Sequence, residues 1–174
     1  CVVLKPASLS PLTALKLGEL AHAAGLPPGV LQVVPGPGGS IGEALMTHPL
    51  IRKVSLTGST EVGRRAMELA ARDFKRVSLE LGGKSPNIVF ADADWLVAAD
   101  ASPMSVFANT GQDCCARSRM FVERSVFEPF VEIFVAATKK LIVGDPSRSE
   151  TQLGPLVSAG QRASVEEFLT DACK

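Results

Sequence analysis

The sequence predicts an α/β fold built on parallel strands, and three observations lead to that prediction. Short apolar runs alternate with longer segments in which apolar residues recur at helical spacing. Turns rich in Gly and Pro separate these segments. Apolar residues make up 46% of the chain, which is ordinary for a globular protein with a packed core. Regular strand–helix alternation is typical of a parallel sheet with right-handed crossovers.

The first half of the chain carries most of this alternation. Its predicted strands are the apolar runs 2–5, 31–34, 53–56 and 77–81. Its predicted helices span 11–24, 40–47 and 58–72. Ser10 is predicted to cap the first helix, with Pro11 at its first position, and Gly25 is predicted to end it. These elements predict one parallel sheet with helices between its strands.

The second half contains the same kinds of element in a less regular order. Its predicted strands are 87–90 and 120–122. Its predicted helices are 95–107, 127–141 and a last one from 159. Asp92 or Asp94 is predicted to cap the first of these helices, and Pro103 to bend it. The pair Gly82-Gly83 marks the predicted boundary between two lobes.

Charge and cysteine usage exclude several classes of partner. Lys plus Arg equals Asp plus Glu at 18 each, so no basic field favours nucleic acid or an anionic membrane. The four cysteines show no CxxC metal spacing, and their arrangement fits a reducing compartment. The chain lacks an 18-residue apolar run and a basic, then apolar, start. We therefore expect a cytoplasmic protein without a metal. Because Cys1–Lys5 already form a predicted strand in mid-sheet, we expect the natural N-terminus further upstream.

The segment Leu-Thr-Gly-Ser-Thr-Glu-Val-Gly, at 56–63, follows a predicted strand and opens a helix. Backbone N–H groups at a helix start, together with the Ser59 hydroxyl, can hold a pyrophosphate. The alternative is a capping box, a common way to begin a helix, in which a serine caps the helix and a Glu side chain bonds back to the backbone N–H of the cap. From these residues alone the two interpretations weigh equally.

Two further motifs offer a carboxylate and a thiol. Glu80 ends an apolar strand before two glycines, where a charged side chain is costly unless it is paired or functional. The alternative is a surface Glu at a strand edge. Cys114 follows Glu80 by 34 positions, and a thiolate attacks carbonyls well. The alternative is a small buried hydrophobe, the usual role of a cysteine outside a disulfide.

In this order and at this spacing, the three motifs resemble the aldehyde dehydrogenase superfamily, in particular members acting on semialdehydes, aminoaldehydes or betaine aldehyde. The resemblance implies an oxidoreductase that converts an aldehyde to a carboxylic acid with NAD or NADP. It implies that Cys114 attacks the aldehyde and passes through a thiohemiacetal and a thioester. It implies that Glu80 activates the hydrolytic water, and that the full-length protein is a homodimer or homotetramer.

The register of the family motif Gly-Gln-x-Cys selects Cys114 over Cys115 as the nucleophile. Arg117 is a departure, because many members have Gly there; it could contact an acidic substrate, although solvent exposure is the simpler expectation. We interpret Asn109 as local helix-end structure. The resemblance also implies a Rossmann-type sheet, with 1–82 the end of the coenzyme-binding domain and 83–174 the start of the catalytic domain.

The family's coenzyme contacts carry over to ten positions here. These are Lys5, Ser8, Gly58, Ser59, Thr60, Glu61, Val62, Gly63, Leu81 and Gly82. Ser8 stands where many NAD-using members carry a Glu, so we expect NADP to be accepted. The glycine-rich loop at 36–42 has its last glycine one residue late for the dinucleotide fingerprint, and we place it near the adenosine end.

Two other functions stay open at this point. One is a truncated coenzyme-binding fragment without catalysis, and the other is a thiol esterase or acyl-transferase, since thioester chemistry needs no NAD. The family's Pro-Trp-Asn and Glu-x-Phe-Gly-Pro segments do not occur in the sequence. We therefore expect the 174-residue chain alone to be inactive.

Overall fold

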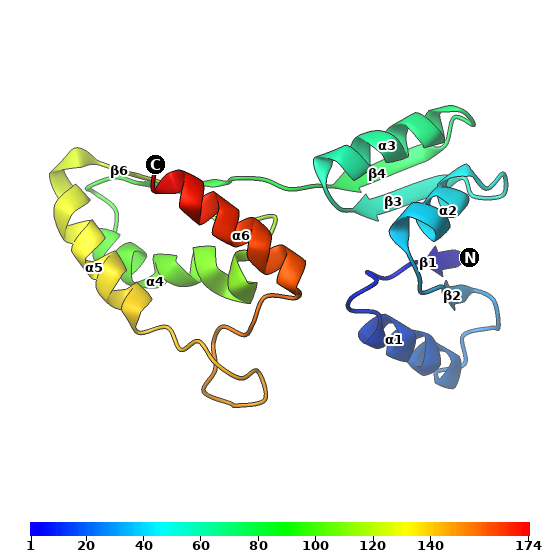
Figure 1. Cartoon of the computed structure of the whole chain (residues 1–174), viewed down its shortest axis with the longest axis horizontal. Coiled ribbons are helices and arrows are strands. Elements are labelled where there is room, and N and C mark those ends of the chain that lie inside the picture. The colour runs from blue at the N-terminus through cyan, green and yellow to red at the C-terminus, as the bar shows by residue number, and fades with distance from the viewer. The chain divides into compact units, whose positions relative to one another are not determined.

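The computed structural model describes residues 1–174, which divide into two compact units, 1–81 and 82–174 (Figure 1). Every strand pairs in parallel with one other strand, and helices separate the strands along the chain except between β4 and β5. This confirms the predicted α/β class. None of the helices combines the length and the hydropathy needed to span a bilayer.

The first unit contains the strand–helix order that the sequence predicts. Its strands are β1 (Val2–Leu4), β2 (Leu31–Val33), β3 (Lys53–Thr57) and β4 (Arg76–Glu80). Its α-helices are α1 (Leu12–Ala23), α2 (Glu43–Thr47) and α3 (Thr60–Ala71). The predicted second helix is divided, because a π-helical turn, η1 (Gly38–Gly42), precedes α2.

The predicted single sheet in this unit is wrong in its pairing. β1 pairs only with β2, and β3 pairs only with β4, so there are two separate parallel ladders. A hollow of about 160 Å³ is lined by consecutive residues of both β1 and β3 and by Met46 of α2. Paired backbones must lie within about 5 Å of each other. Within these residues, the hollow therefore lies between β1 and β3, and no ladder joins the two strands.

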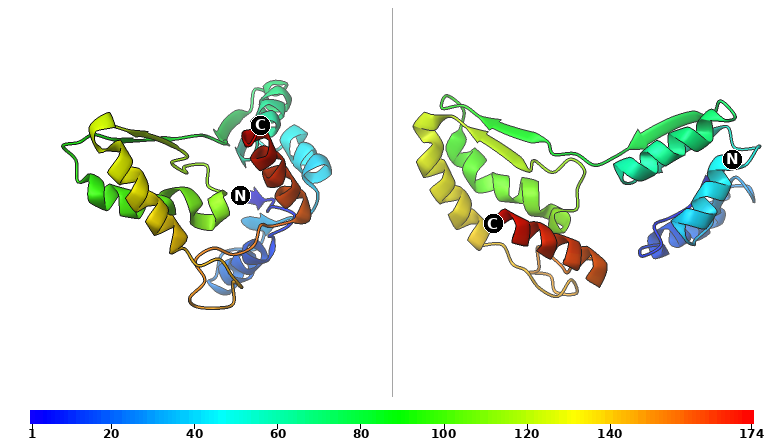
Figure 2. Two further views of the ribbon diagram at one scale, coloured as in Figure 1. Left: turned by 60° about the vertical axis from the view of Figure 1, so that its left-hand side comes forward. Right: turned by 45° about the horizontal axis from the view of Figure 1, so that its top comes forward.

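The core of the first unit lies between α3 and the β3–β4 pair (Figure 2). Ala66 and Leu69 of α3 are buried at helical spacing, and they pack with Val54 of β3 and Met46 of α2. A periodic apolar stripe of this kind turns one helix face toward a sheet. The stripe therefore fixes which side of α3 faces β3 and β4.

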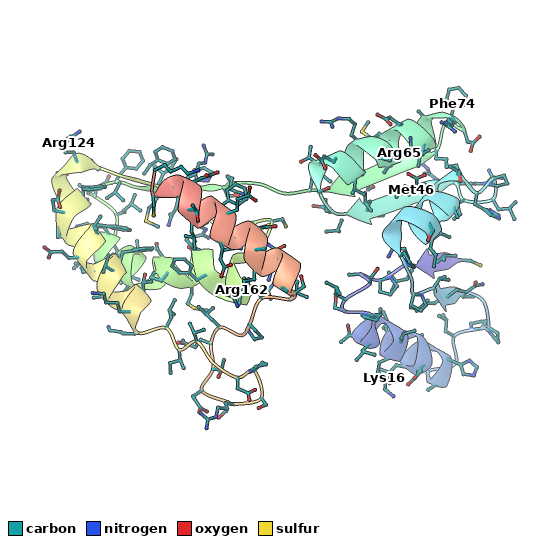
Figure 3. The ribbon with its side chains drawn as sticks, in the orientation of Figure 1. Lys16, Met46, Arg65, Phe74, Arg124 and Arg162 are labelled. Atoms are coloured by element: carbon teal, nitrogen blue, oxygen red, sulfur yellow. The ribbon has the colours of Figure 1, made fainter.

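A surface ion pair joins α2 to α3. Arg65 Nε lies 2.8 Å from Glu43 Oε1, and both side chains are well exposed; Figure 3 labels Arg65 on α3 and Met46 on α2. The hydrogen bond from Arg65 holds the pKa of Glu43 below its usual value. Exposed pairs contribute little to stability, so the buried stripe rather than this pair holds the two helices together.

The ends of α1 test two predictions about caps. Ser10 is not the cap, because the helix begins at Leu12 with Pro11 as the preceding residue and no side-chain cap bond. The Ser10 N–H instead donates to the Ala7 carbonyl in the preceding turn. Gly25 ends the helix as predicted, since it adopts φ 86°, a left-handed conformation that glycine reaches without a steric penalty.

The second unit is built around one parallel pair and three α-helices. The strands are β5 (Pro86–Val89) and β6 (Arg119–Val122), with Pro86 opposite Arg119. The helices are α4 (Trp95–Phe107), α5 (Phe127–Lys139) and α6 (Ala159–Ala172). The short 3₁₀ turns η2 (Ala108–Gly111) and η3 (Arg124–Val126) follow α4 and β6 respectively.

The core of this unit forms where α4 and α5 lie side by side and cover one face of β5 and β6 (Figure 1). Val89, Ala99 and Phe130 are buried at its centre. Asp94 rather than Asp92 caps α4, because its Oδ1 accepts a bond of 3.3 Å from the Val97 N–H. This packing fixes the end of α4, from which the cysteine loop departs.

Candidate active site

Cys114 lies in an exposed loop between α4 and β6. The loop begins with three successive residues in the left-handed region, Asn109, Thr110 and Gly111, at φ 52°, 57° and 74°. Thr110 is β-branched, so this conformation stores about 1–3 kcal/mol of strain. The strained turn reverses the chain at the end of α4 and leads directly into the Gly-Gln-Asp-Cys motif.

Asn109 serves the local structure of this turn, as the sequence predicts. Its Nδ2 donates to the Gln112 carbonyl at 3.1 Å, and the Gln112 N–H donates back to the Asn109 carbonyl at 3.1 Å. Asn is also among the residues that most readily adopt a left-handed backbone. The amide of Asn109 is therefore occupied within the loop rather than directed at a ligand.

The thiols of Cys114 and Cys115 are exposed neighbours on this loop. Their Sγ atoms are 3.7 Å apart, and the Cys115 N–H donates to Asp113 Oδ1 at 2.9 Å. The next residue, Ala116, is buried, and the Arg117 N–H donates to the Ser105 carbonyl of α4 at 3.1 Å. The Arg117 side chain is exposed, and solvent exposure was the simpler expectation from the sequence. The loop thus presents both sulfurs to solvent from an anchored backbone.

The two glycines that follow Glu80 differ in their surroundings. Gly82 has open space where a Cβ would stand. A Cβ at Gly83 would lie 3.2 Å from the Cys114 carbonyl oxygen, a tight backbone contact within the second unit. Gly83 is therefore required for the close passage of this segment along the cysteine loop.

Arg119, the first residue of β6, makes structural contacts near the site that the sequence reasoning missed. Its Nε donates to the Lys84 carbonyl at 2.7 Å, and its backbone N–H donates to the Ser85 carbonyl at 3.3 Å. Its guanidinium also lies 5.8 Å from the centroid of the Phe121 ring. These contacts join the Gly83–Ser85 segment to the cysteine loop. The only signal in the sequence was a second arginine just after the cysteine motif.

Glu80 is the last residue of β4, and its side chain is exposed. This position matches the alternative of a surface Glu at a strand edge, and burial does not add to the cost of the carboxylate. Glu80 stands opposite Thr57 in the ladder, and its carbonyl accepts a bond of 3.0 Å from the Gly58 N–H. Glu80 and the Gly58 turn thus share the carboxyl edge of the β3–β4 pair, the edge where parallel sheets bind ligands.

The start of α3 is capped by Ser59, whose Oγ accepts a bond of 3.2 Å from the Val62 N–H. The capping box offered as the alternative is wrong in its Glu. That motif needs a Glu or Gln at the third helical position, which is Val62 here, and Glu61 stands one position earlier. First-turn N–H groups point out of a helix N-terminus. The cap uses one of these donors, and those of Thr60 and Glu61 face the same end of the helix.

Gly63 is buried against the segment that follows Glu80. A Cβ at Gly63 would meet the Leu81 side chain at 2.8 Å, closer than side chains tolerate. Leu81, one of the predicted coenzyme residues, thus packs over the first turn of α3. The glycine lets the two segments approach.

This contact predicts a loss of stability for Gly63→Val. The larger side chain must displace Leu81, and overpacking of this kind costs about 1–3 kcal/mol. Gly160→Val is the matched control, because the helical Gly160 is exposed and its nearest neighbour is 3.8 Å from the Cβ position. Urea unfolding should show a clear loss for the first and a change within about 0.5 kcal/mol for the second. Equal midpoints for the two variants would contradict the packing argument.

The predicted adenosine-end residues converge on one carbonyl. Ser8 Oγ donates to the Gly36 carbonyl at 3.1 Å, and Lys5 Nζ reaches the same oxygen at 3.3 Å and the Pro6 carbonyl at 2.7 Å. Gly36 has φ 143° and contacts the Ile41 side chain. The fold therefore brings the 36–42 loop to the carboxyl end of β1, beside Lys5 and Ser8.

Comparison with known proteins identifies the family of the chain. The whole chain, residues 1–174, matches the model of the aldehyde dehydrogenase family. It is 47% identical to succinate-semialdehyde dehydrogenase [NADP(+)] GabD of Escherichia coli over 171 residues, which is 98% of this chain and 36% of that protein. It is 48% identical to human retinaldehyde dehydrogenase 3 over 174 residues, 99% of this chain and 34% of that protein.

Solved structures give the same result. The chain superimposes on the aldehyde dehydrogenase KauB of Pseudomonas aeruginosa with a TM-score of 0.95 at 43% identity, covering 97% of this chain and 34% of that one. It superimposes equally well on an indole-3-acetaldehyde dehydrogenase in complex with NAD+, with the same TM-score, identity and coverage. The chain spans about a third of the length of the proteins it matches. Over its whole length, it belongs to the aldehyde dehydrogenase family.

Proposed function

We propose that the whole protein oxidises an aldehyde to a carboxylic acid with NAD+ or NADP+. The observation that carries this proposal is the family match over the whole chain, which includes the Cys114 loop and the Glu80 segment. The similar proteins are named as dehydrogenases, which disfavours a thiol esterase and a fragment without catalysis. Their names cover semialdehydes and retinal at nearly equal identity, so the substrate proposal stays at the aldehyde class.

The residues of the first unit fit a dinucleotide. The N-terminus of α3 carries the positive end of a 12-residue helix, where a pyrophosphate is stabilised by N–H groups and the helix dipole. We assign this position to Gly58–Gly63, with Ser59 as the cap. Lys5 and Ser8 would then hold the adenosine ribose beside the 36–42 loop. When bound, the coenzyme supplies the hydride acceptor.

In the proposed mechanism, the Cys114 thiolate attacks the aldehyde carbon, and a C–S bond forms as the carbonyl oxygen becomes an oxyanion. The Cys114 backbone N–H donates to that oxyanion. After oxidation to the thioester, Glu80 takes a proton from a water molecule, which attacks the acyl carbon. The carboxylic acid leaves, and the cysteine is regenerated.

The exposure of Cys114 and Glu80 supports these roles, since both groups must meet substrate or water. The covalent chain adds a second support. Glu80 precedes Gly83 by three residues, a length that reaches about 10 Å at most. A Cβ at Gly83 would lie only 3.2 Å from the Cys114 carbonyl oxygen. A short stretch of chain therefore separates the proposed base from a glycine that lies beside the proposed nucleophile.

Formation of reduced coenzyme, followed by its absorbance, tests the proposal. The whole protein should reduce NAD+ or NADP+ only when an aldehyde is present. Ester cleavage without any coenzyme reduction would favour the esterase instead. We further propose a cytoplasmic homodimer or homotetramer, and light scattering of the whole protein tests the number of subunits.

The environment of Ser8 predicts the coenzyme preference. A Glu at this position would accept charge-assisted bonds from the ribose hydroxyls and repel a 2′-phosphate, whereas serine is uncharged, does not repel the phosphate and leaves Lys5 beside the site. Each charge-assisted bond contributes about 1.5–3 kcal/mol, or tenfold and more in affinity. We expect the protein to use NADP+ at least as well as NAD+, and Ser8→Glu to shift the ratio of kcat/KM values about tenfold toward NAD+.

Ser10→Glu is the matched control for this shift. Ser10 is exposed and only two positions away, so the variant carries the same added charge at a position that does not reach Gly36. It should leave the ratio of kcat/KM values unchanged. Strong selectivity of the unmodified protein for NAD+, together with no response to Ser8→Glu, would show that the 2′-position is recognised by other residues.

A further inference from the structure

Asp113, the residue before the proposed nucleophile, holds the turn that contains Cys114. Its backbone carbonyl accepts a bond of 3.1 Å from the Ala116 N–H, which closes a turn with Cys114 and Cys115 at its centre. Its side-chain Oδ1 accepts a second bond, of 2.9 Å, from the Cys115 N–H. Asp is favoured at the first position of common β-turns because its side chain can bond the backbone N–H two residues on. Asp113 therefore occupies the N–H groups of both Cys115 and Ala116.

The remaining N–H group of the turn, that of Cys114, has no acceptor in the chain. A peptide unit is planar and trans, so the Asp113 carbonyl and the Cys114 N–H point in opposite directions. Because the carbonyl is turned inward to Ala116, the Cys114 N–H is turned outward. This is the N–H that donates to the oxyanion in the proposed mechanism.

We propose that Asp113 is a positioning residue for the dehydrogenase reaction, whose carboxylate holds the turn so that the Cys114 N–H stays directed at the oxyanion. The inference rests on the proposed function in taking Cys114 as the nucleophile. The peptide unit that follows Cys114 supports it, because that unit is held on both sides. Its N–H is bound by Asp113 Oδ1, and its carbonyl oxygen lies 3.2 Å from where a Cβ of Gly83 would stand.

A second turn in the same unit has the same two bonds but lies outside the proposed site. Asp145, in the loop after α5, accepts at 3.1 Å from the Arg148 N–H with its carbonyl and at 2.9 Å from the Ser147 N–H with Oδ1. The bond from the Ser147 N–H holds the pKa of Asp145 below its usual value. The position that matches Cys114 is Pro146, which has no N–H. Asp145 is therefore a matched control, with the same turn and no donor to position.

The test compares two reactions of the Cys114 sulfur, of which only one forms an oxyanion. Acylation by p-nitrophenyl acetate passes through an oxyanion before nitrophenolate leaves, whereas alkylation by iodoacetamide displaces iodide without one. Every form of the whole protein carries Cys115→Ala, which keeps the backbone N–H at position 115 and leaves one thiol in the loop. The burst of nitrophenolate gives the acylation rate, and tandem mass spectrometry of the Cys114 peptide gives the alkylation rate.

Asp113→Ala should slow acylation at least about tenfold, within the roughly 10²–10³-fold effect of losing an oxyanion donor, and should change alkylation less than about threefold. Asp113→Asn keeps an oxygen that can accept the same bond, so acylation should return to at least about a third of the rate with Asp113 in place. Asp145→Ala should leave both rates unchanged. In all variants, kcat/KM for the aldehyde should change with the acylation rate.

Equal acylation rates for Asp113→Ala and Asp145→Ala would overturn the inference. Equal losses of acylation and alkylation would also overturn it, because the sulfur itself would then be disturbed. The same holds if Asp113→Asn is as slow as Asp113→Ala, or if kcat/KM stays constant while acylation falls. Neither reaction needs coenzyme, so a protein that shows the expected acylation pattern but reduces no coenzyme would contradict the proposed dehydrogenase while the role of Asp113 stands.

Discussion

Cys114→Ala in the whole protein is expected to abolish aldehyde oxidation, with kcat lowered at least about 10⁴-fold. The substitution removes the sulfur that forms the covalent intermediate, and losses of this size follow when a covalent nucleophile is deleted. Cys114 is exposed and makes no contribution to a buried core, so the variant should fold normally. Steady-state formation of reduced coenzyme gives the rate.

Cys115→Ala is the control that separates the two adjacent thiols. It should keep most of the activity, because the Gly-Gln-x-Cys register places Cys115 one position beyond the nucleophile. Coenzyme binding measured by calorimetry should be retained in both variants, since the proposed dinucleotide residues lie in 1–82. An inactive Cys115→Ala variant beside an active Cys114→Ala variant would show that the register is wrong.

Glu80→Gln is expected to slow turnover by about 10²–10⁴-fold while leaving the first turnover largely intact. Gln has nearly the same size as Glu but cannot accept a proton, and Glu80 is exposed at a strand end, so the fold should tolerate the change. Stopped-flow absorbance should therefore show a burst of reduced coenzyme followed by a slow steady state, with a thioester accumulating on Cys114.

Glu132→Gln is the matched control, because Glu132 is an exposed carboxylate on α5 outside the proposed site. It should leave both phases unchanged. Loss of the burst together with the steady state in Glu80→Gln would instead assign Glu80 to the formation of the thiolate. A steady state as fast as that of the unmodified protein would exclude Glu80 as the hydrolytic base.

Local sequence signals predicted the elements of this fold closely. Apolar runs predicted all six strands, and Gly25 ends α1 in the left-handed conformation that glycine favours. Short-range rules also limited the α4 cap to Asp92 or Asp94, of which Asp94 is the cap, and offered the Ser59 cap as one of two interpretations, since a cap depends on residues within three positions. The rule failed at Ser10, where the helix begins two residues later and the serine lies in the preceding turn.

Long-range arrangement was decided only by the tertiary structure. The alternation of strands and helices predicted one sheet, but the first unit has two ladders with a hollow between β1 and β3. The spacing of apolar residues along the sequence does not show which strand edges pair with one another. In the same way, the motif at Glu80 left open whether the carboxylate is a costly charge in an apolar strand or a surface group, and the structure shows it exposed at the strand end.

The candidate site shows the same division. The order and spacing of its motifs in the sequence were enough to identify the family and to nominate Cys114 and Glu80. The contact of Gly83 with the Cys114 carbonyl, the Arg119 bond to Lys84, and the meeting of Lys5 and Ser8 at Gly36 came only from the fold. Each of these joins residues about 28–35 positions apart, and such contacts depend on how helices and strands pack rather than on the residues beside them in the chain.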